Sequence, residues 1–327
     1  MREIFRSTAL LLATLMLTTV GHAKDYNAGL ANIDMTDPET QKPVRALVWY
    51  PTHATGPAVQ RGPFRLDVVE NAPAASGPHP LILLSHGNAG SPLGHRDTGQ
   101  ALAEAGFIVA APLHAGDNFQ DQSLLGTDLL LKSRPRSISA LIDKIIHDRR
   151  FQADGQRIGF IGFSAGGFTG LALLGARPSL GQMGLHCKLH TDDAFCQYVK
   201  EDFGAPDPID GLADPRIRAA VIMAPNTSLF NDADLQKIDK PMLLMAAEKD
   251  QILTAPYHAI RVSQLSPGVR EFWIMENAQH FSFLAPFPEA MRAELGELAE
   301  DRPGFDRQAS HQEINQKTTA FLEEFLY

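Results

Sequence analysis

One segment constrains the fold of this 327-residue chain more than any other: residues 157–167, with the sequence RIGFIGFSAGG. An apolar run ends at Phe163, and it overlaps a Gly-x-Ser-x-Gly pattern that extends from Gly162 to Gly166. A strand that turns sharply into a helix exposes the serine hydroxyl at the turn and strains the backbone of that serine. Glycine flanks such a turn because a side chain would collide with neighbouring backbone. We therefore expect Ser164 to be a nucleophile, presented between a strand and a helix.

Apolar runs and helical patterns alternate along most of the chain. The predicted strands are 44–50, 80–85, 107–112, 157–163, 218–224, 241–247 and 270–276, and the predicted helices are 95–105, 136–150, 168–175, 255–265 and 311–326. Helices that alternate with strands imply parallel strands joined by right-handed crossovers. The sequence therefore predicts an α/β fold with a mostly parallel central sheet flanked by helices.

Two stretches interrupt this alternation. Residues 53–79 are rich in Pro, Ala and Gly, and we predict mainly a surface connection there. Residues 177–216 hold both cysteines and many charges, and we predict an insertion over the carboxyl edge of the sheet, as a lid or pocket wall. No linker divides residues 24–327, which we predict to be one domain.

The first residues have the pattern of an export signal. Arg2 and Arg6 are followed by a short apolar stretch, residues 8–20, and then by small residues that end at Ala23. We predict a signal peptide over residues 1–23, with cleavage after Ala23; a buried N-terminal helix is the alternative. The mature chain would be periplasmic or secreted, with no stable membrane anchor. The formal net charge of the full chain, −9, argues against a nucleic-acid partner.

The two cysteines, Cys187 and Cys196, are close in the sequence. In an exported protein such a pair predicts a disulfide. His186 and His190 lie beside them, so a metal site is an alternative, but the spacing matches no familiar zinc pattern. Free thiols are the third possibility, and our prediction is a disulfide and no metal.

A serine nucleophile needs a base, and the base needs a carboxylate that orients it. Where the nucleophile follows a strand in this way, the acid comes next in the chain and the base comes last. Asp250 follows the strand at 241–247, and His280 follows the strand at 270–276. Functional loops follow the carboxyl ends of parallel strands. We therefore predict a triad of Ser164, Asp250 and His280.

Other residues compete for these roles. Glu248 and Asp232 are alternative acids, and His114 follows a strand as His280 does. We predict that His114 lines the substrate pocket instead, and that His258 is a surface residue of a helix.

Negative charge that develops on an attacked carbonyl oxygen needs two N–H donors aimed at it. Ala165 begins the helix after the nucleophile, where backbone N–H groups have no intrahelical partner. The second donor is predicted in residues 85–90, as the backbone N–H of Asn88, whereas His86 is expected to make structural hydrogen bonds.

An apolar cluster follows His280 in the sequence. Phe281 and Phe283 are its first members, and Leu284, Pro286 and Phe287 complete it. We predict that Phe281 and Phe283 contact an acyl or alcohol group of the substrate; ordinary packing of this loop onto the core is the alternative.

These features together resemble the α/β-hydrolase superfamily. More narrowly, the chain resembles the exported bacterial branch of predicted dienelactone hydrolases, which is akin to platelet-activating-factor acetylhydrolases. The resemblance rests on residues 84–88, 162–167 and 45–51, and it covers most of residues 27–290. It implies an α/β-hydrolase fold and a cofactor-free serine esterase.

The chain departs from these relatives at two positions. Dienelactone hydrolases have a cysteine nucleophile where this chain has Ser164. The acetylhydrolases carry their acid after the strand that follows the nucleophile, whereas residues 223–226 contain no carboxylate. The second departure favours Asp250 as the acid.

The sequence thus predicts hydrolysis of a small-molecule or polymeric carboxylic ester through an acyl-enzyme intermediate, with no cofactor. An amidase or peptidase with the same triad, and a binding protein that has lost turnover, are alternatives. A metal-dependent activity of residues 186–196 is a third. The sequence names neither the ester nor the oligomeric state.

Overall fold

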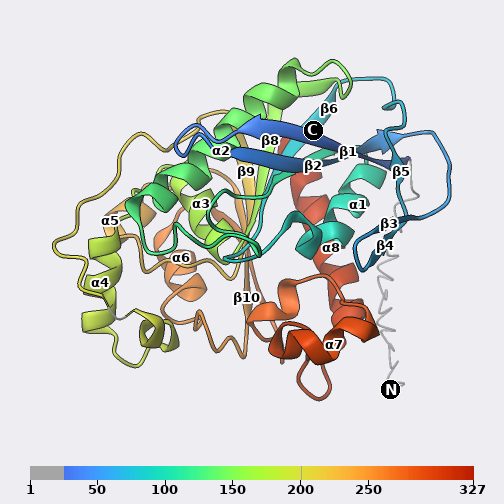
Figure 1. The fold of residues 1–327 in the computed structure, drawn as a ribbon. Helices are drawn as coiled ribbons and strands as arrows, with labels where there is room; N and C mark the ends of the chain where they lie inside the picture. The colour runs from blue at the N-terminus through green and yellow to red at the C-terminus, as the bar shows by residue number, and fades with distance from the viewer. Residues whose placement is uncertain (1–25, 200) are drawn as a thin grey trace, which may run out of the picture.

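The computed structural model describes residues 26–199 and 201–327, and a nine-stranded sheet forms its centre (Figure 1). The predicted signal peptide lies outside the described residues. The strands are β1 (Asn27–Thr36), β2 (Pro43–Thr52), β3 (Val59–Arg61), β4 (Phe64–Leu66), β5 (Val69–Glu70), β6 (His79–Ser85), β7 (Ile108–Pro112), β8 (Ala153–Phe163), β9 (Ile217–Met223), β10 (Met242–Ala247) and β11 (Val269–Met275). The order across the sheet is β11-β10-β9-β8-β6-β7-β2-β1-β5, while β3 and β4 pair separately.

Eight α-helices and four short 3₁₀ helices accompany these strands in the described part of the chain. The α-helices are α1 (Arg96–Glu104), α2 (Asp128–His147), α3 (Ala165–Leu173), α4 (Leu180–Leu189), α5 (Asp232–Leu235), α6 (Ala259–Leu265), α7 (Glu289–Leu295) and α8 (Arg307–Leu326). The 3₁₀ helices are η1 (Pro92–His95), η2 (Ala194–Tyr198), η3 (His280–Phe283) and η4 (Gly296–Leu298).

The sheet is mostly parallel. From β7 through β6, β8, β9 and β10 to β11, each strand runs parallel to its neighbour, whereas β2 pairs antiparallel with both β7 and β1. Parallel strands bring their carboxyl ends to one edge of the sheet. Ser164, Asp250 and His280 each follow the end of such a strand, so the topology brings all three to the same edge.

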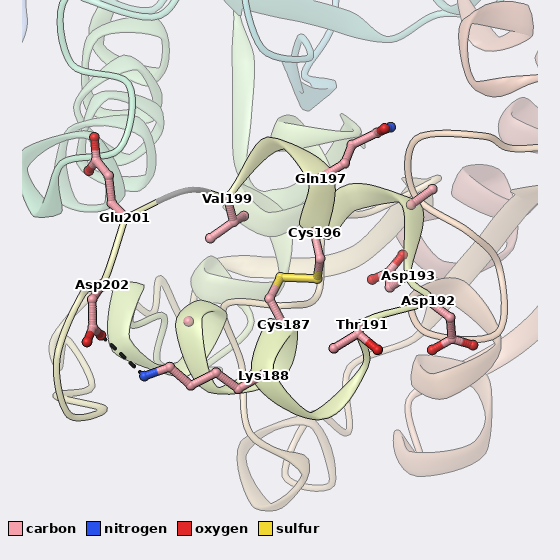
Figure 2. Close-up of a pocket in the computed structure, with 12 residues that line it drawn as sticks. Cys187, Lys188, Thr191, Asp192, Asp193, Cys196, Gln197, Val199, Glu201 and Asp202 are labelled. Atoms are coloured by element: carbon pink, nitrogen blue, oxygen red, sulfur yellow. Dashed lines mark hydrogen bonds and ion pairs between the residues drawn. A yellow bond between two sulfur atoms is a disulfide. The ribbon is translucent and has the colours of Figure 1, made fainter.

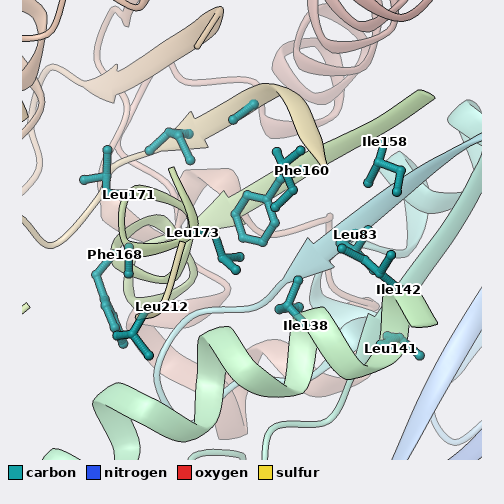
Figure 3. Packing of buried hydrophobic residues seen from close by; sticks show 14 of the residues in the cluster. Leu83, Ile138, Leu141, Ile142, Ile158, Phe160, Phe168, Leu171, Leu173 and Leu212 are labelled. Carbon is teal, nitrogen blue, oxygen red and sulfur yellow. The ribbon is translucent and has the colours of Figure 1, made fainter. Parts of the chain in front are cut away.

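Both faces of the sheet are covered, because alternate residues of a strand point to opposite sides. Leu83 and Phe160 belong to a core shared with α2 and α3, as Figure 3 shows. Their neighbours Leu84 and Ile161 belong to a second core, shared with α1 and α8. Burial on both faces explains why the segment at 80–85 is continuously apolar rather than alternating.

The predicted strands and helices are present, with some of their ends shifted. The largest shift is in α2, which begins at Asp128 and continues through Pro135. Buried Leu131 and Ile138, on either side of the proline, pack this helix onto the sheet core, and such packing outweighs the lost backbone hydrogen bond.

Residues 53–79 form mainly a connection, as predicted, but the short strands β3, β4 and β5 lie within them and were not predicted. Gly62, with a φ of +56°, makes the tight turn between β3 and β4. Phe64 and Leu66 are buried, so this short hairpin packs onto the molecule.

Candidate active site

Ser164 occupies a strained turn between β8 and α3. Its φ of +54° and ψ of −112° lie in a region that non-glycine residues rarely adopt. A Cβ at Gly162 would lie 2.2 Å from the carbonyl oxygen of Gly166, and a Cβ at Gly166 would lie 1.9 Å from that of Ser85. The Ser164 N–H donates to the carbonyl of Met223, 2.9 Å away. The Gly-x-Ser-x-Gly spacing is therefore a steric requirement of this turn.

Ser164, His280 and Asp250 form a chain of hydrogen bonds. The distance from His280 Nε2 to Ser164 Oγ is 3.0 Å, and that from His280 Nδ1 to Asp250 Oδ2 is 2.7 Å. The other carboxylate oxygen accepts the backbone N–H groups of Ile252 (2.9 Å) and Leu253 (2.8 Å). This arrangement holds the proton on Nδ1 and leaves Nε2 free to accept the proton of the serine.

The two alternative acids have other partners. Glu248 accepts from Lys249 Nζ at 2.7 Å and from the backbone N–H of Asn277 at 2.8 Å. Asp232 accepts from Arg261 at 2.7 Å. Of the three candidate acids, Asp250 is the one that is bonded to His280.

The loop that holds the predicted oxyanion donor Asn88 lies against the nucleophile. A Cβ at Gly87 would be 3.3 Å from Ser164 Cβ. Within the described residues, the backbone N–H of Asn88 has no hydrogen-bond acceptor, and Asn88 lines the cavity in front of Ser164. Ala165 is the first residue of α3, where an N–H has no intrahelical partner, although Ala165 itself is not among the cavity-lining residues.

A buried ion pair that the sequence analysis did not predict supports this loop. Arg134 and Asp117 are both 0 % exposed, and Arg134 Nη1 lies 2.6 Å from Asp117 Oδ2. The other oxygen of Asp117 accepts from Asn88 Nδ2 and from the backbone N–H of Ala89, the latter at 3.0 Å. The ion pair therefore restrains both the side chain of Asn88 and the backbone that follows it.

The same guanidinium joins this loop to the helix that follows the nucleophile. Arg134 donates to Ser85 Oγ at 3.1 Å and to the carbonyl of His86. It also donates to Thr169 Oγ1, on α3, at 3.0 Å. Arg134 lies four residues before Ile138, on the buried face of α2, and a charged residue in that pattern is the signal that could have identified it.

His86 has a structural role, as predicted from its position in the loop. Its Nδ1 contacts the carbonyl of Gly87 at 2.7 Å, and its Nε2 accepts the backbone N–H of His114 at 3.2 Å. Burial lowers the pKa of His86 to about 3, so the ring is neutral at physiological pH.

The prediction that His114 lines the pocket is wrong. The side chain is buried beneath the loop, with Nε2 at 2.8 Å from Ser85 Oγ, and it does not line the cavity. Burial, reinforced by the nearby Arg134, holds the pKa of His114 well below its usual value.

A cavity of about 820 Å³ opens in front of Ser164 and His280. Its lining is mainly apolar and includes Phe281, as predicted. The same prediction for Phe283 is wrong: this residue is 1 % exposed, does not line the cavity, and packs on the lining residue Phe163, with 5.9 Å between ring centroids.

The prediction that residues 177–216 cover the site is also wrong. None of the described residues in this segment lines the cavity, and residues of the 281–298 segment form one of its walls instead. In Figure 1, α4 lies at the left of the molecule and α7 at the lower right. The insertion is held on its own side by contacts such as that of Arg177 with Asp234, at 3.1 Å.

The predicted disulfide between Cys187 and Cys196 is present, and it joins α4 to η2 beside a second cavity of about 620 Å³ (Figure 2). His186, Asp193 and Cys196 offer ligand atoms within 4.8 Å of one another. However, the sulfur of Cys196 forms a disulfide with that of Cys187, and His186 forms a hydrogen bond with Asp193. This trio is therefore a poor fit for a zinc ion.

His258 is not on the surface, contrary to the prediction, but is 0 % exposed. Its Nε2 lies 3.1 Å from Asp193 Oδ2, and His186 Nε2 lies 2.8 Å from the same oxygen. Thr254 Oγ1 donates to Asp193 Oδ1 at 2.9 Å, and the backbone N–H of Thr227 donates to His258 Nδ1 at 3.2 Å. We refer to His186, Asp193, Thr254 and His258 as the Asp193 cluster.

Comparison with solved structures identifies the fold. The ferulic acid esterase from Streptomyces cinnamoneus matches with a TM-score of 0.64 and 16 % sequence identity, over 93 % of this chain and 91 % of that one. The chain therefore has the α/β-hydrolase fold, as predicted. No protein-family model matches the chain, and a search of curated proteins also finds no match. Among the described residues, no helix is long and apolar enough to cross a membrane.

Proposed function

We propose that this protein is a serine-dependent hydrolase of carboxylic esters. One observation carries the proposal: the hydrogen-bonded chain of Ser164, His280 and Asp250 opens on a largely apolar cavity of about 820 Å³. A cavity of this size, with few polar groups near a reactive side chain, is typical of a small-molecule site. The fold that it shares with a ferulic acid esterase is consistent with the same chemistry.

In the proposed mechanism, His280 Nε2 takes the proton of Ser164 as Oγ attacks the ester carbonyl. The backbone N–H groups of Asn88 and Ala165 stabilise the oxyanion, and Asp250 stabilises the imidazolium. Collapse of the tetrahedral intermediate expels the alcohol, which receives the proton from His280 and leaves an acyl group on Ser164. His280 then takes a proton from water as it attacks the acyl group, and it returns this proton to Ser164 Oγ as the acid is released.

We further propose that the protein acts after export. A disulfide within the insertion is consistent with an oxidising compartment. We also propose that the protein belongs with the exported predicted dienelactone hydrolases and acetylhydrolases, because it resembles them in residues 84–88 and 162–167.

The test is the Ser164→Ala variant, measured with p-nitrophenyl butyrate. We expect kcat/KM to fall by about 10³-fold or more, because the nucleophile is removed. A fluorophosphonate probe should label the native protein at Ser164 and leave the variant unlabelled. Undiminished turnover by a correctly folded variant would contradict the proposal, and faster cleavage of a matched amide than of the ester would favour an amidase.

A further inference from the structure

Five apolar side chains beyond His280 form a continuous stripe. They are Leu284, Phe287, Met291, Leu295 and Leu298, at intervals of three, four, four and three residues. Met291 and Leu295 lie one turn apart on the same face of α7, whereas Leu284 and Phe287 precede this helix and Leu298 lies in η4. All five line the cavity in front of Ser164. We refer to these five residues as the apolar stripe.

Packing within the protein accounts for only part of this stripe. None of the residues of α7 is buried, and Met291 and Leu295 are only half-buried. The first three members of the stripe touch the edge of the core, whereas Leu295 and Leu298 are not among the residues packed against it. A helix that keeps apolar residues on one side without burying them leaves that side available to a ligand.

The opposite wall of the cavity is also apolar. It includes Phe64, whose ring centroid lies 6.3 Å from that of Phe287, so the two walls meet. The guanidinium of Arg96 lies 4.2 Å over the ring of Phe64 and also donates to the carbonyl of Pro286. At another part of the lining, Phe119 is 61 % exposed.

The charges at this cavity do not favour an ionic ligand. No acidic residue is found among the described residues that line it. The two lining arginines, Arg45 and Arg61, are each paired with a carboxylate, Asp34 and Glu70 respectively. An uncharged hydrocarbon is favoured in such surroundings, because burying a charge without a partner is costly.

We propose that the apolar stripe binds the extended hydrocarbon chain of the substrate, and that the preferred esters carry a long aliphatic acyl or alkyl group. This inference rests on the proposed esterase function. Leu284 lies four residues beyond His280 and lines the same cavity as His280 and Ser164, so the stripe shares the cavity with the reacting groups. A chain attached to the ester can therefore lie along it while the carbonyl faces Ser164.

The experiment compares short and long esters in two arms, below the concentration at which the esters form micelles. One arm measures kcat/KM for p-nitrophenyl octanoate against p-nitrophenyl acetate, and the other measures octyl acetate against ethyl acetate. In at least one arm we expect the native protein to favour the long ester by about ten-fold or more, because each additional methylene buried against the stripe strengthens binding. The arm that shows the preference identifies the side of the ester that binds the stripe.

Met291→Glu and Leu295→Glu should each lower the long-to-short ratio by about ten-fold in that arm. Ala293→Glu is the matched control, because Ala293 is exposed on the same helix and does not line the cavity; it should leave the ratio unchanged. Thermal unfolding of each variant tests for misfolding, and the milder Leu298→Gln serves if either variant fails to fold.

A native protein that cleaves acetate esters but shows no preference for long chains in either arm would overturn this inference and leave the esterase proposal intact. The same holds if the ratio is equal in Leu295→Glu and Ala293→Glu. Failure of the proposed function is a different result: no ester is hydrolysed and Ser164 is not labelled by the fluorophosphonate.

Discussion

Two buried aspartates each hold histidine side chains in this molecule, but their surroundings differ. Asp250 binds His280, and the far nitrogen of that ring faces Ser164 in the cavity. Asp193 lies against His186 and His258. The far nitrogen of His258 accepts the backbone N–H of Thr227. A His–Asp pair therefore does not by itself indicate catalysis, and the group that faces the second ring nitrogen distinguishes the two arrangements.

The Asp193 cluster joins two parts of the chain. Asp193 belongs to the insertion, while Thr254 and His258 follow β10, as Asp250 does. Burial raises the pKa of Asp193, but the hydrogen bond from His186 and the close contact with His258 outweigh it and keep the pKa below its usual range. A buried carboxylate that stays ionised among these donors stabilises the docked insertion.

Paired histidine variants test this comparison most strongly. His280→Asn should lower kcat for p-nitrophenyl butyrate by about 10⁴-fold or more, because the base is lost. His258→Asn should change kcat by less than about ten-fold, since His258 does not touch the cavity. If a folded His258→Asn protein lost activity as severely as His280→Asn, the distinction between the Asp250–His280 pair and the Asp193 cluster would be wrong.

Paired aspartate variants in the insertion test the stabilising role. Asp193→Asn should lower the free energy of unfolding in urea by about 2–3 kcal/mol, because hydrogen bonds to a buried charge are lost. Asp192→Asn is the control: this exposed neighbour forms a hydrogen bond with Tyr257, and its substitution should change the free energy of unfolding far less than Asp193→Asn. Equal losses in the two variants would argue against a special role for the Asp193 cluster.

Acidification should lower the free energy of unfolding through His258 of the Asp193 cluster, by less than Asp193→Asn does. Burial lowers the pKa of His258, although Asp193 opposes the shift. As the pH falls below about 6.5, the unfolded chain binds a proton at His258 that the folded chain does not, so stability is lost until the folded pKa is reached.

The contribution of His258 is at most about 1.4 kcal/mol per pH unit. Burial likewise lowers the pKa of His95, to about 4, so His95 adds a similar loss between about pH 6.5 and 4. Urea unfolding at pH 7, 6 and 5 measures the total slope, and His258→Asn should show a shallower one. Identical slopes for the native protein and His258→Asn would show that His258 binds a proton equally in the folded and unfolded states.

Features of the fold and the site were predictable from the sequence where they depend on residues that are close together in the chain. The strained turn at Ser164 was predictable, because the glycines that it requires lie within two residues. The order of acid and base along the chain pointed to Asp250 and His280. Residue type and sequence position did not predict which other side chains are buried. His114 follows a strand and Phe283 follows His280, yet both are buried and neither lines the cavity.

The sequence alone determined the α/β layering, the disulfide between two cysteines that are close in the chain, and the turn at Ser164. Each of these depends on periodicity, steric fit or proximity within one segment. Only the tertiary structure decided which distant groups meet. His280 and Ser164 are 116 residues apart, and they meet because parallel strands end at one edge of the sheet. Packing of distant segments likewise buried Arg134 behind Asn88, placed the insertion away from the cavity and aimed the apolar stripe into it. Local patterns cannot specify such encounters, since burial depends on everything that packs around a residue.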